Sequence, residues 1–351
     1  MLLFLVKKNS RLRFNFFVIL IMKDYKIVVI GAVKSTERIL NGLLRNNINV
    51  VGVLGLDRSV SRKVSGYVDL GALCQVENVP YKSFININDD ENIKWVRNLK
   101  PDYMFAVGFS QLLKHDILAI PQFGTIGFHP TKLPKGRGRA PLAWLTYNAE
   151  DGAASFFLMT DGADSGDIFV QEPFTVDKDD HAFHVEEKIL SAIDKGLDKW
   201  LPLFKDGRTK PVPQCDEQAS YTGIRREIDG LIDWEEPGDM TYARIRAASK
   251  PHPGAYTFAN GRKLLIWEAA MIDRCNFWGA PGRVLEDVAD GYLVQAGDKV
   301  LKLLQMEYFD NPKETVSLKV GQLLGYRPQQ EIHKMYQEIN ALKKKIEELK
   351  K

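Results

Sequence analysis

Three short, uninterrupted apolar segments limit the possible folds of this chain most strongly. KIVVIG (26–31), NVVGVLGL (49–56) and DYMFAVGF (102–109) have the length of strands that are buried on both faces. Between the first two, residues 39–44 place apolar side chains at helical spacing. Buried strands that alternate with helices predict a Rossmann-like α/β fold, doubly wound around a parallel sheet.

Two phosphate-binding motifs that such folds often carry are absent. GAVKST (31–36) follows the first predicted strand, but it lacks the Gly-Lys pair and the upstream glycine of a phosphate loop. The GxGxxG dinucleotide fingerprint is also missing. The sequence therefore gives no support for a site of either type.

Three segments are expected beyond the carboxyl ends of strands, where open parallel sheets bind ligands. The first comprises Val107, Gly108, Phe109, Ser110, Gln111, Leu112 and Leu113. The second is GTIGFHPTKLPKGRGRAP (124–141), in which His129 stands between a strand-like run and a stiff basic loop. The third is an acidic, glycine-rich turn within residues 155–172 that contains Asp164.

A histidine and an aspartate that meet at such an edge are suited to proton transfer. Imidazole titrates near neutrality, and an adjacent carboxylate orients the ring and stabilises imidazolium. No GxSxG motif supplies a nucleophile, so we expect the nucleophile to come from a substrate, for example an amine. The alternative is a structural His129 and a turn-capping Asp164. Pro130 and Pro134 argue against it, because they stiffen the chain beside the histidine.

Two motifs, in this order, resemble a known family. HPTKLPKGRG (129–138) followed by DGADSGDI (161–168) is similar to the signature of the N10-formyltetrahydrofolate-dependent formyltransferases. Residues 229–269 and 280–307 resemble the second domain of methionyl-tRNA formyltransferase and of amino-sugar formyltransferases. The similarity covers roughly residues 22–325. It implies an enzyme that transfers a formyl group from N10-formyltetrahydrofolate to a primary amine.

The resemblance also implies roles for individual residues. His129 and Asp164 take the positions of the catalytic histidine and aspartate, without settling which of them moves the proton and which supports it. Residues 107–113 match the folate-binding loop, and Arg137 matches the arginine of the LPxxRG loop.

One position departs from the family pattern. Asn-x-His here reads Gly127, Phe128, His129, so the asparagine is replaced by glycine. In the family that amide donates a hydrogen bond to the developing oxyanion, and loss of such a donor typically lowers the rate by about 10²–10³. Another donor, a backbone N–H or a water would have to replace it, or the reaction differs. Folate dehydrogenase/hydrolase relatives also lack this asparagine.

Two further clusters of polar residues carry weaker signals. Lys135, Arg137 and Arg139 form a basic loop that is predicted to hold a phosphate or the glutamate tail of folate; a solvated loop is the alternative. His181 and His184 lie three residues apart, but no third ligand is visible. We therefore predict a solvated helix face there and no metal site.

The chain is expected to divide into five parts. The apolar run at 14–22 is too short for a membrane span, and no signal cleavage site follows it, so Met22 is the expected functional start. The predicted parts are a leader of doubtful function (1–21), the catalytic domain (22–205), a linker (206–222), a small OB-like β-barrel domain (223–325) and a coiled-coil helix (326–351).

The last part shows a heptad seam. Its apolar residues step by three and four, with isoleucine at a and mostly leucine at d, which favours a parallel two-stranded coil and hence a homodimer. The seam consists of Ile332, Met335, Ile339, Leu342, Ile346 and Leu349. The alternative is a helix that packs on its own domain.

Charge bears on the choice of acceptor. A net charge of +3 over 351 residues gives no basic surplus for nucleic acid. We therefore expect a nucleotide-linked amino sugar rather than methionyl-tRNA, with a formyl-folate hydrolase or an inactive binding homologue as further alternatives. Three scattered cysteines indicate a reducing, cytoplasmic setting.

Overall fold

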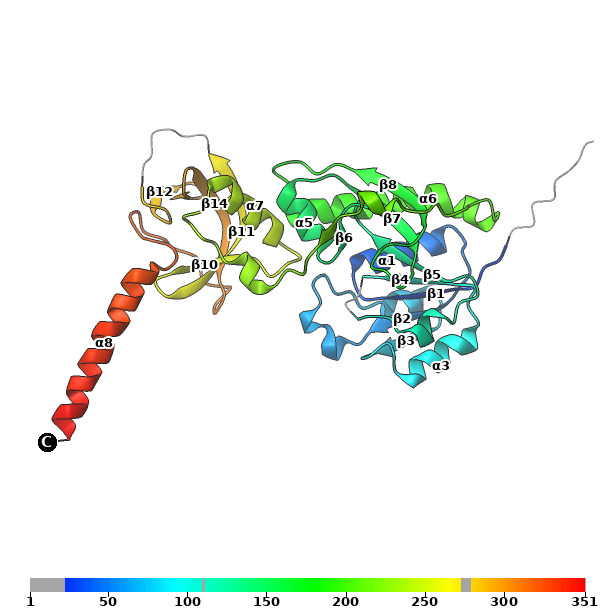
Figure 1. The fold of residues 1–351 in the computed structure, drawn as a ribbon, viewed down its shortest axis with the longest axis horizontal. Helices are drawn as coiled ribbons and strands as arrows, with labels where there is room; N and C mark the ends of the chain where they lie inside the picture. The colour runs from blue at the N-terminus through cyan, green and yellow to red at the C-terminus, as the bar shows by residue number, and fades with distance from the viewer. Residues whose placement is uncertain (1–22, 109–110, 273–278, 351) are drawn as a thin grey trace, which may run out of the picture.

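The first domain is built on a seven-stranded sheet in the order β3-β2-β1-β4-β5-β7-β8 (Figure 1). The computed structural model describes residues 23–108, 111–272 and 279–350, so the predicted leader lies outside the described residues. The strands are β1 (Ile27–Gly31), β2 (Val50–Leu56), β3 (Tyr81–Phe84), β4 (Tyr103–Val107), β5 (Thr125–His129), β7 (Gly152–Leu158) and β8 (Ile168–Phe174). The first five strands in this order pair in parallel, whereas β7 and β8 are antiparallel additions at one edge.

Helices cover both faces of this sheet. Alternation along β1 sends Ile27 and Val29 into one apolar cluster and Val28 and Ile30 into the other. The helices on the first face include α1 (Lys34–Arg45), α2 (Gly71–Val76) and α6 (Ala182–Lys205), and those on the second include α3 (Asp90–Leu99) and α4 (His115–Leu118). The predicted α/β fold with a mostly parallel sheet is therefore confirmed.

A threonine joins two strand ends beside the predicted folate-binding loop. The hydroxyl of Thr36 in α1 donates a 2.8 Å hydrogen bond to the carbonyl of Val107 and accepts the backbone N–H groups of Ala32 and Val33. Because Thr36 is fully buried, these bonds fix where β1 and β4 end. The loop after Val107 therefore starts from a rigid point.

The second domain contains a five-stranded antiparallel sheet in the order β10-β11-β14-β13-β12. Its strands are β10 (Ala255–Ala259), β11 (Arg262–Ile272), β12 (Val284–Val288), β13 (Gly291–Gln295) and β14 (Val300–Tyr308). The helix α7 (Gly238–Ala248) packs on β11. Trp234 and Tyr242 join the apolar core of this domain.

The five-stranded sheet of the second domain does not close into a barrel by continuous strand pairing. Its edge strands β10 and β12 do not pair with each other within the described residues, and a short irregular segment lies between them instead. Gly325 donates its N–H to Phe258 of β10, and Gln322 accepts the N–H of Val284 of β12. The predicted OB-like barrel is thus not confirmed as a closed barrel, because isolated bridges replace continuous strand pairing at the seam.

The predicted linker packs on the first domain over much of its length. Val212 forms an isolated bridge with Ile168, and β9 (Tyr221–Thr222) pairs in parallel with β6 (Arg137–Gly138). β6 belongs to the basic loop after His129. Residues 206–222 therefore form part of the framework around that loop.

The last helix, α8 (Pro328–Leu349), extends away from the second domain (Figure 1). Its root is held by Arg327, which donates to the carbonyl of Pro281 at 2.7 Å and forms an ion pair with Glu235. In the part of the chain that the structure describes, no helix has both the length and the apolar composition needed to cross a bilayer.

The contact between the domains contains a buried histidine at the start of α6. The Nδ1 of His181 lies 3.2 Å from the carbonyl of Asp179, and its Nε2 accepts the N–H of Ala269 in β11 at 3.4 Å. Nearby, the buried Arg246 of α7 donates to the carbonyls of Thr146 and Asp180. Burial lowers the pKa of His181 to about 4, so the folded protein holds this ring neutral.

We expect acid to destabilise this contact. The folded pKa lies below the unfolded value near 6.5, so stability is full above about pH 6.5 and is lost as the pH falls toward 4. At pH 5 the unfolded chain binds this proton and the folded protein does not, so the free energy of unfolding should be about 2 kcal/mol lower than above pH 6.5. Thermal melts across this range should show a weaker pH dependence in His181→Gln and an unchanged one in His333→Gln, on the exposed α8. An equal slope in all three proteins would contradict this account.

Candidate active site

His129 ends β5 and is almost completely buried, with 5% of its surface exposed. Its Nε2 lies 2.8 Å from the carbonyl oxygen of Gly136, and its Nδ1 lies 3.6 Å from the Oδ2 of Asp164. A carbonyl only accepts, so Nε2 carries a proton. In the neutral form of the ring, the Nδ1 that faces the carboxylate is then the nitrogen that accepts.

Asp164 lies in the turn between β7 and β8, in a left-handed backbone conformation with φ of 50°. Its Oδ2 accepts the N–H of Gly138 at 2.8 Å, and its own carbonyl accepts the side-chain amide of Gln214 at 2.8 Å. Aspartate is among the few residues that tolerate this conformation, and surrounding bonds must hold it there. The structure thus brings the predicted pair together.

The short segment 136–138 holds both members of the pair. Gly136 supplies the carbonyl that meets His129, and Gly138 supplies the N–H that meets Asp164. The linker fixes this segment in turn, because the hydroxyl of Ser220 accepts the N–H of Gly136 at 2.9 Å. At Gly138, with φ of 107°, a Cβ atom would lie 2.5 Å from the carbonyl of Thr222, so only glycine permits this approach.

Arg137 does not lie where a phosphate ligand would be expected. It is 1% exposed, and it makes four hydrogen bonds with its five N–H groups. Gln214 accepts two of these bonds, Tyr221 one, and Asp216 one at 2.7 Å as an ion pair. The prediction that it forms part of a surface phosphate loop is corrected, because its donors already bind the linker.

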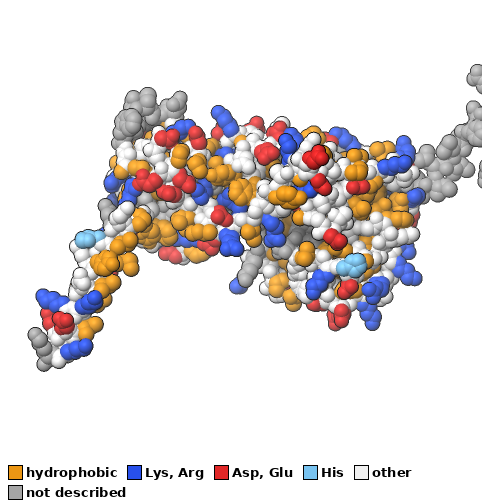
Figure 2. All heavy atoms as spheres, viewed as in Figure 1, with side chains coloured by type: hydrophobic (Ala, Val, Ile, Leu, Met, Phe, Trp, Pro, Cys, Tyr) orange, Lys and Arg blue, Asp and Glu red, His pale blue; other side chains and the backbone are white. Residues whose placement is uncertain are grey.

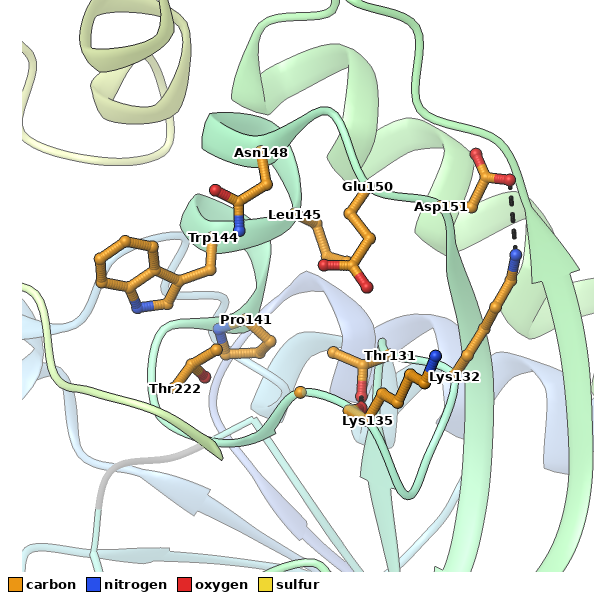
Figure 3. Close-up of a pocket in the computed structure, with 11 residues that line it drawn as sticks. Thr131, Lys132, Lys135, Pro141, Trp144, Leu145, Asn148, Glu150, Asp151 and Thr222 are labelled. Carbon is orange, nitrogen blue, oxygen red and sulfur yellow. Dashed lines mark hydrogen bonds and ion pairs between the residues drawn. The ribbon is translucent and has the colours of Figure 1, made fainter. Parts of the chain in front are cut away.

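Lys135 and Arg139 fit the prediction of an accessible basic loop better, because both are exposed. The adjacent pocket in Figure 3 is small: it is lined by Lys135, Trp144 and Thr222 among others, with a cavity volume of about 20 Å³. That volume is enough for a water molecule. Lys132 beside it is paired with Asp151 at 3.4 Å (Figure 3).

A larger cavity, of about 250 Å³, lies between the two domains. Ala140 and Ala143 line it from the first domain, and Arg225, Arg226 and His252 line it from the chain beyond the linker. Its lining residue Ala140 lies two residues after Gly138, whose N–H binds the Asp164 carboxylate. Arg225 is further placed by ring contacts, with its guanidinium 5.2 Å from the Trp144 ring.

The segment predicted to bind folate is fixed at its centre. The side chain of Gln111 accepts the N–H of Ile87 and donates to the carbonyl of Ile85. Gly108 has a φ of 61°, and Leu113 is buried, whereas Leu112 is 84% exposed. Phe109 and Ser110 lie outside the described residues.

Gly127 sits directly opposite Phe157 in the β5–β7 pair, and the space beside its Cα is already filled. A Cβ atom on Gly127 would lie 2.7 Å from the Phe157 ring and 3.1 Å from the Cγ of Met159. Phe157 is buried and occupies the space that a longer side chain would need. The phenylalanine and the glycine therefore form a matched pair.

Restoring the asparagine alone should fail. Gly127→Asn overpacks the site against Phe157 and should cost about 1–3 kcal/mol of folding stability, with no gain in rate. Adding Phe157→Leu should recover part of that loss, so that the double variant melts above the sum of the single effects. Additive effects in a denaturation cycle that includes Phe157→Leu alone would show that the two positions are not coupled.

Within the described residues, no three metal-ligating side chains converge. His181 and His184 instead interact with each other: the His184 Nδ1 accepts the backbone N–H of His181 at 3.2 Å. This contact caps the start of α6 rather than leaving a solvated histidine pair.

The sequence interpretation missed the part played by the linker. Gln214, Ser220 and Tyr221 hold the segment 136–138, yet they lie about 80 residues away along the chain. Their stretch has no apolar periodicity, and Pro211 and Pro213 suggested only a connection. The one cue in the sequence was Arg137 itself, since a guanidinium that becomes buried needs several acceptors.

Comparison with known proteins shows the family of this chain. Residues 25–201 match the family described as formyl transferase, and residues 225–317 match its C-terminal domain. A methionyl-tRNA formyltransferase from Caldanaerobacter subterraneus subsp. tengcongensis is 32% identical over 221 residues, covering 63% of this chain and 71% of that protein.

Solved structures share the fold at lower identity. A HypX variant from Aquifex aeolicus is 16% identical with a TM-score of 0.61, over 82% of this chain and 45% of that chain, so this chain spans less than half of HypX. An N-formyltransferase from Helicobacter canadensis, solved with folinic acid and dTDP-3-aminofucose, is 16% identical with a TM-score of 0.59, over 80% and 99% of the two chains. Since the two family matches span most of its length, the chain belongs to the formyl transferase family and is an N-formyltransferase.

Proposed function

We propose that this enzyme transfers the formyl group of N10-formyltetrahydrofolate to the primary amine of a nucleotide-linked amino sugar. The observation that carries the proposal is the His129–Asp164 pair, 3.6 Å apart at the carboxyl edge of the sheet. Such a pair suits an amine that must lose a proton as it forms a new bond. The family resemblance gives His129 and Asp164 the positions of the catalytic pair, without settling which of them moves the proton.

In the proposed reaction the folate supplies the formyl carbon, the amine attacks it, and the bond to the folate nitrogen breaks. Asp164 is the more accessible member of the pair, with 22% of its side chain exposed against 6% for His129. We therefore assign the first proton acceptance to the Asp164 carboxylate, which Gly138 orients. The unprotonated Nδ1 of His129 shares that proton, and the folate nitrogen finally receives one as it leaves.

The donor would bind along residues 107–113. The exposed Leu112 offers an apolar surface to a flat ring, and the bonds of Gln111 to residues 85 and 87 hold the loop in place. Structures of relatives support this choice of donor, since the Helicobacter enzyme was solved with folinic acid. The reducing cytoplasm, where the free Cys215 would persist, is the proposed location.

The acceptor class rests on accessible positive charge near the pair. Lys135 and Arg139 are exposed on the loop after His129, and the exposed Arg226 and the half-buried Arg225 line the cavity between the domains. Arginine binds phosphate oxygens in a bidentate manner, so a nucleoside diphosphate suits this cavity. The Helicobacter enzyme, solved with a dTDP-linked aminosugar, supports the same class.

A second candidate is formylation of methionyl-tRNA. The 32% identity to a methionyl-tRNA formyltransferase favours it, whereas the modest net charge of +3 does not. Hydrolysis of the formyl folate without an acceptor is a further alternative, because no side-chain amide stands at Gly127.

Parallel assays separate these candidates. The enzyme is incubated with formyl-tetrahydrofolate and either a panel of nucleotide-linked amino sugars or charged initiator tRNA, and the release of folate and the product masses are followed. The proposal expects a formylated sugar. Formylation of the tRNA alone would overturn the acceptor class, and formate release without either acceptor would indicate hydrolysis.

A further inference from the structure

The helix α8 exposes an apolar stripe that its own chain leaves uncovered. Figure 2 shows hydrophobic side chains along one edge of the projecting helix, with charged side chains toward its tip. The six seam residues Ile332, Met335, Ile339, Leu342, Ile346 and Leu349 are between 44% and 87% exposed. The alternative that this helix packs on its own domain is therefore not what the structure shows.

Leaving six such side chains in water is costly. Full burial of one isoleucine, leucine or methionine is worth about 1.5–3 kcal/mol, and a contiguous exposed stripe of this kind marks an interaction surface. The surface is a narrow ridge roughly 33 Å long, given 22 residues at about 1.5 Å each. Its shape matches another helix of the same kind better than a flat or concave partner.

The residue types within the stripe select the partner. Isoleucine occupies every a position and leucine two of the three d positions, the arrangement that favours parallel two-stranded coils. A second copy of α8 presents the same ridge in the same register, so each a side chain meets its equivalent.

The flanking charges are compatible with this pairing. In a parallel coil, Glu338 at g faces Lys343 at e of the second copy, and this attraction occurs twice. Neither side chain forms an ion pair within its own chain among the described residues. Lys345 and Lys350 repel each other in the same arrangement, but they lie at the exposed end of the helix.

We propose that α8 pairs with α8 of a second copy as a parallel two-stranded coiled coil, and that this coil makes the enzyme a homodimer. Three heptads are marginal for an isolated helix, so the association should be reversible and depend on concentration. The coil lies away from His129, so each subunit keeps a complete catalytic pair.

Sedimentation of the full-length enzyme tests the pairing. The unchanged chain should sediment with twice the mass of one chain at high concentration and dissociate on dilution. Ile339→Glu with Leu342→Glu should sediment as a monomer, because the two charges would be buried in the seam. Both residues are exposed in the single chain, so the variant should still fold and retain formyl transfer.

The matched control carries the same charges on the outer face of the same turns. Asn340→Glu with Ala341→Glu should leave the dimer unchanged. A chain that is monomeric at every concentration, or a dimer that survives the Ile339 and Leu342 substitutions, would overturn the proposal.

Disulfide cross-linking tests the direction of the helices. In a parallel pair the two Leu349 side chains meet, whereas in an antiparallel pair each lies opposite Ile332, at the far end of the coil. Leu349→Cys should therefore cross-link the dimer under mild oxidation, above the level given by the native cysteines of the unchanged chain. A dimer of this variant that does not cross-link would overturn the parallel arrangement.

Discussion

Replacing His129 with alanine should lower formyl transfer by at least about 10²-fold, and Asp164→Asn should do the same. The first change removes the ring that shares a proton with the carboxylate. The second removes the negative charge but leaves an oxygen that can still accept the N–H of Gly138. Asparagine also tolerates the left-handed backbone at this position. The variant therefore tests the loss of the negative charge without adding backbone strain.

Steady-state kinetics with saturating donor measure these effects, and thermal melts show whether each variant folds. Asp161→Ala, an exposed carboxylate in the same turn, and His333→Ala, on α8, serve as matched controls with unchanged rates. Rates within about tenfold of the unchanged enzyme for either site variant would rule out the assigned roles.

Arg137→Ala should lower both stability and turnover. Its guanidinium joins the segment 136–138 to Gln214, Asp216 and Tyr221, and that segment holds both catalytic side chains. We expect a loss of about 2–3 kcal/mol, moderated because Asp216 is 79% exposed and stays solvated without its partner. The rate constant kcat should fall by more than about tenfold, because a small displacement of a catalytic pair slows the reaction strongly.

Arg139→Ala is the matched control. Arg139 lies two residues after Arg137 and carries the same charge, but its side chain is exposed. It should leave the melting temperature unchanged and alter only the KM for a phosphate-bearing acceptor. If Arg137→Ala instead raised that KM and left kcat and stability intact, Arg137 would be a substrate ligand rather than a positioning residue.

The α/β core could be predicted from the sequence because strands that are buried on both faces consist almost entirely of apolar residues. Strands such as Ile27–Gly31 are uninterrupted apolar runs that are buried at every position. The second domain left a weaker mark. The bridges that join the edges of its sheet through residues 322–325 depend on tertiary contacts.

Part of the site could be predicted, and part could not. Motif order placed His129 and Asp164 together, and the structure brings them within 3.6 Å. The charge of Arg137 suggested an exposed phosphate ligand, but burial depends on residues about 80 positions away. The space beside Gly127 is limited in the same way, because the Phe157 ring of the neighbouring strand β7 fills it.

The most direct test of the central claim follows the formyl group itself. The enzyme is given N10-formyltetrahydrofolate labelled in the formyl carbon, together with the panel of nucleotide-linked amino sugars, and the label is located by mass spectrometry. The account predicts that the label appears in an amide on one of the sugars, and that Asp164→Asn abolishes this product. Label that is released as formate, or that stays on the folate with every amine offered, would contradict it.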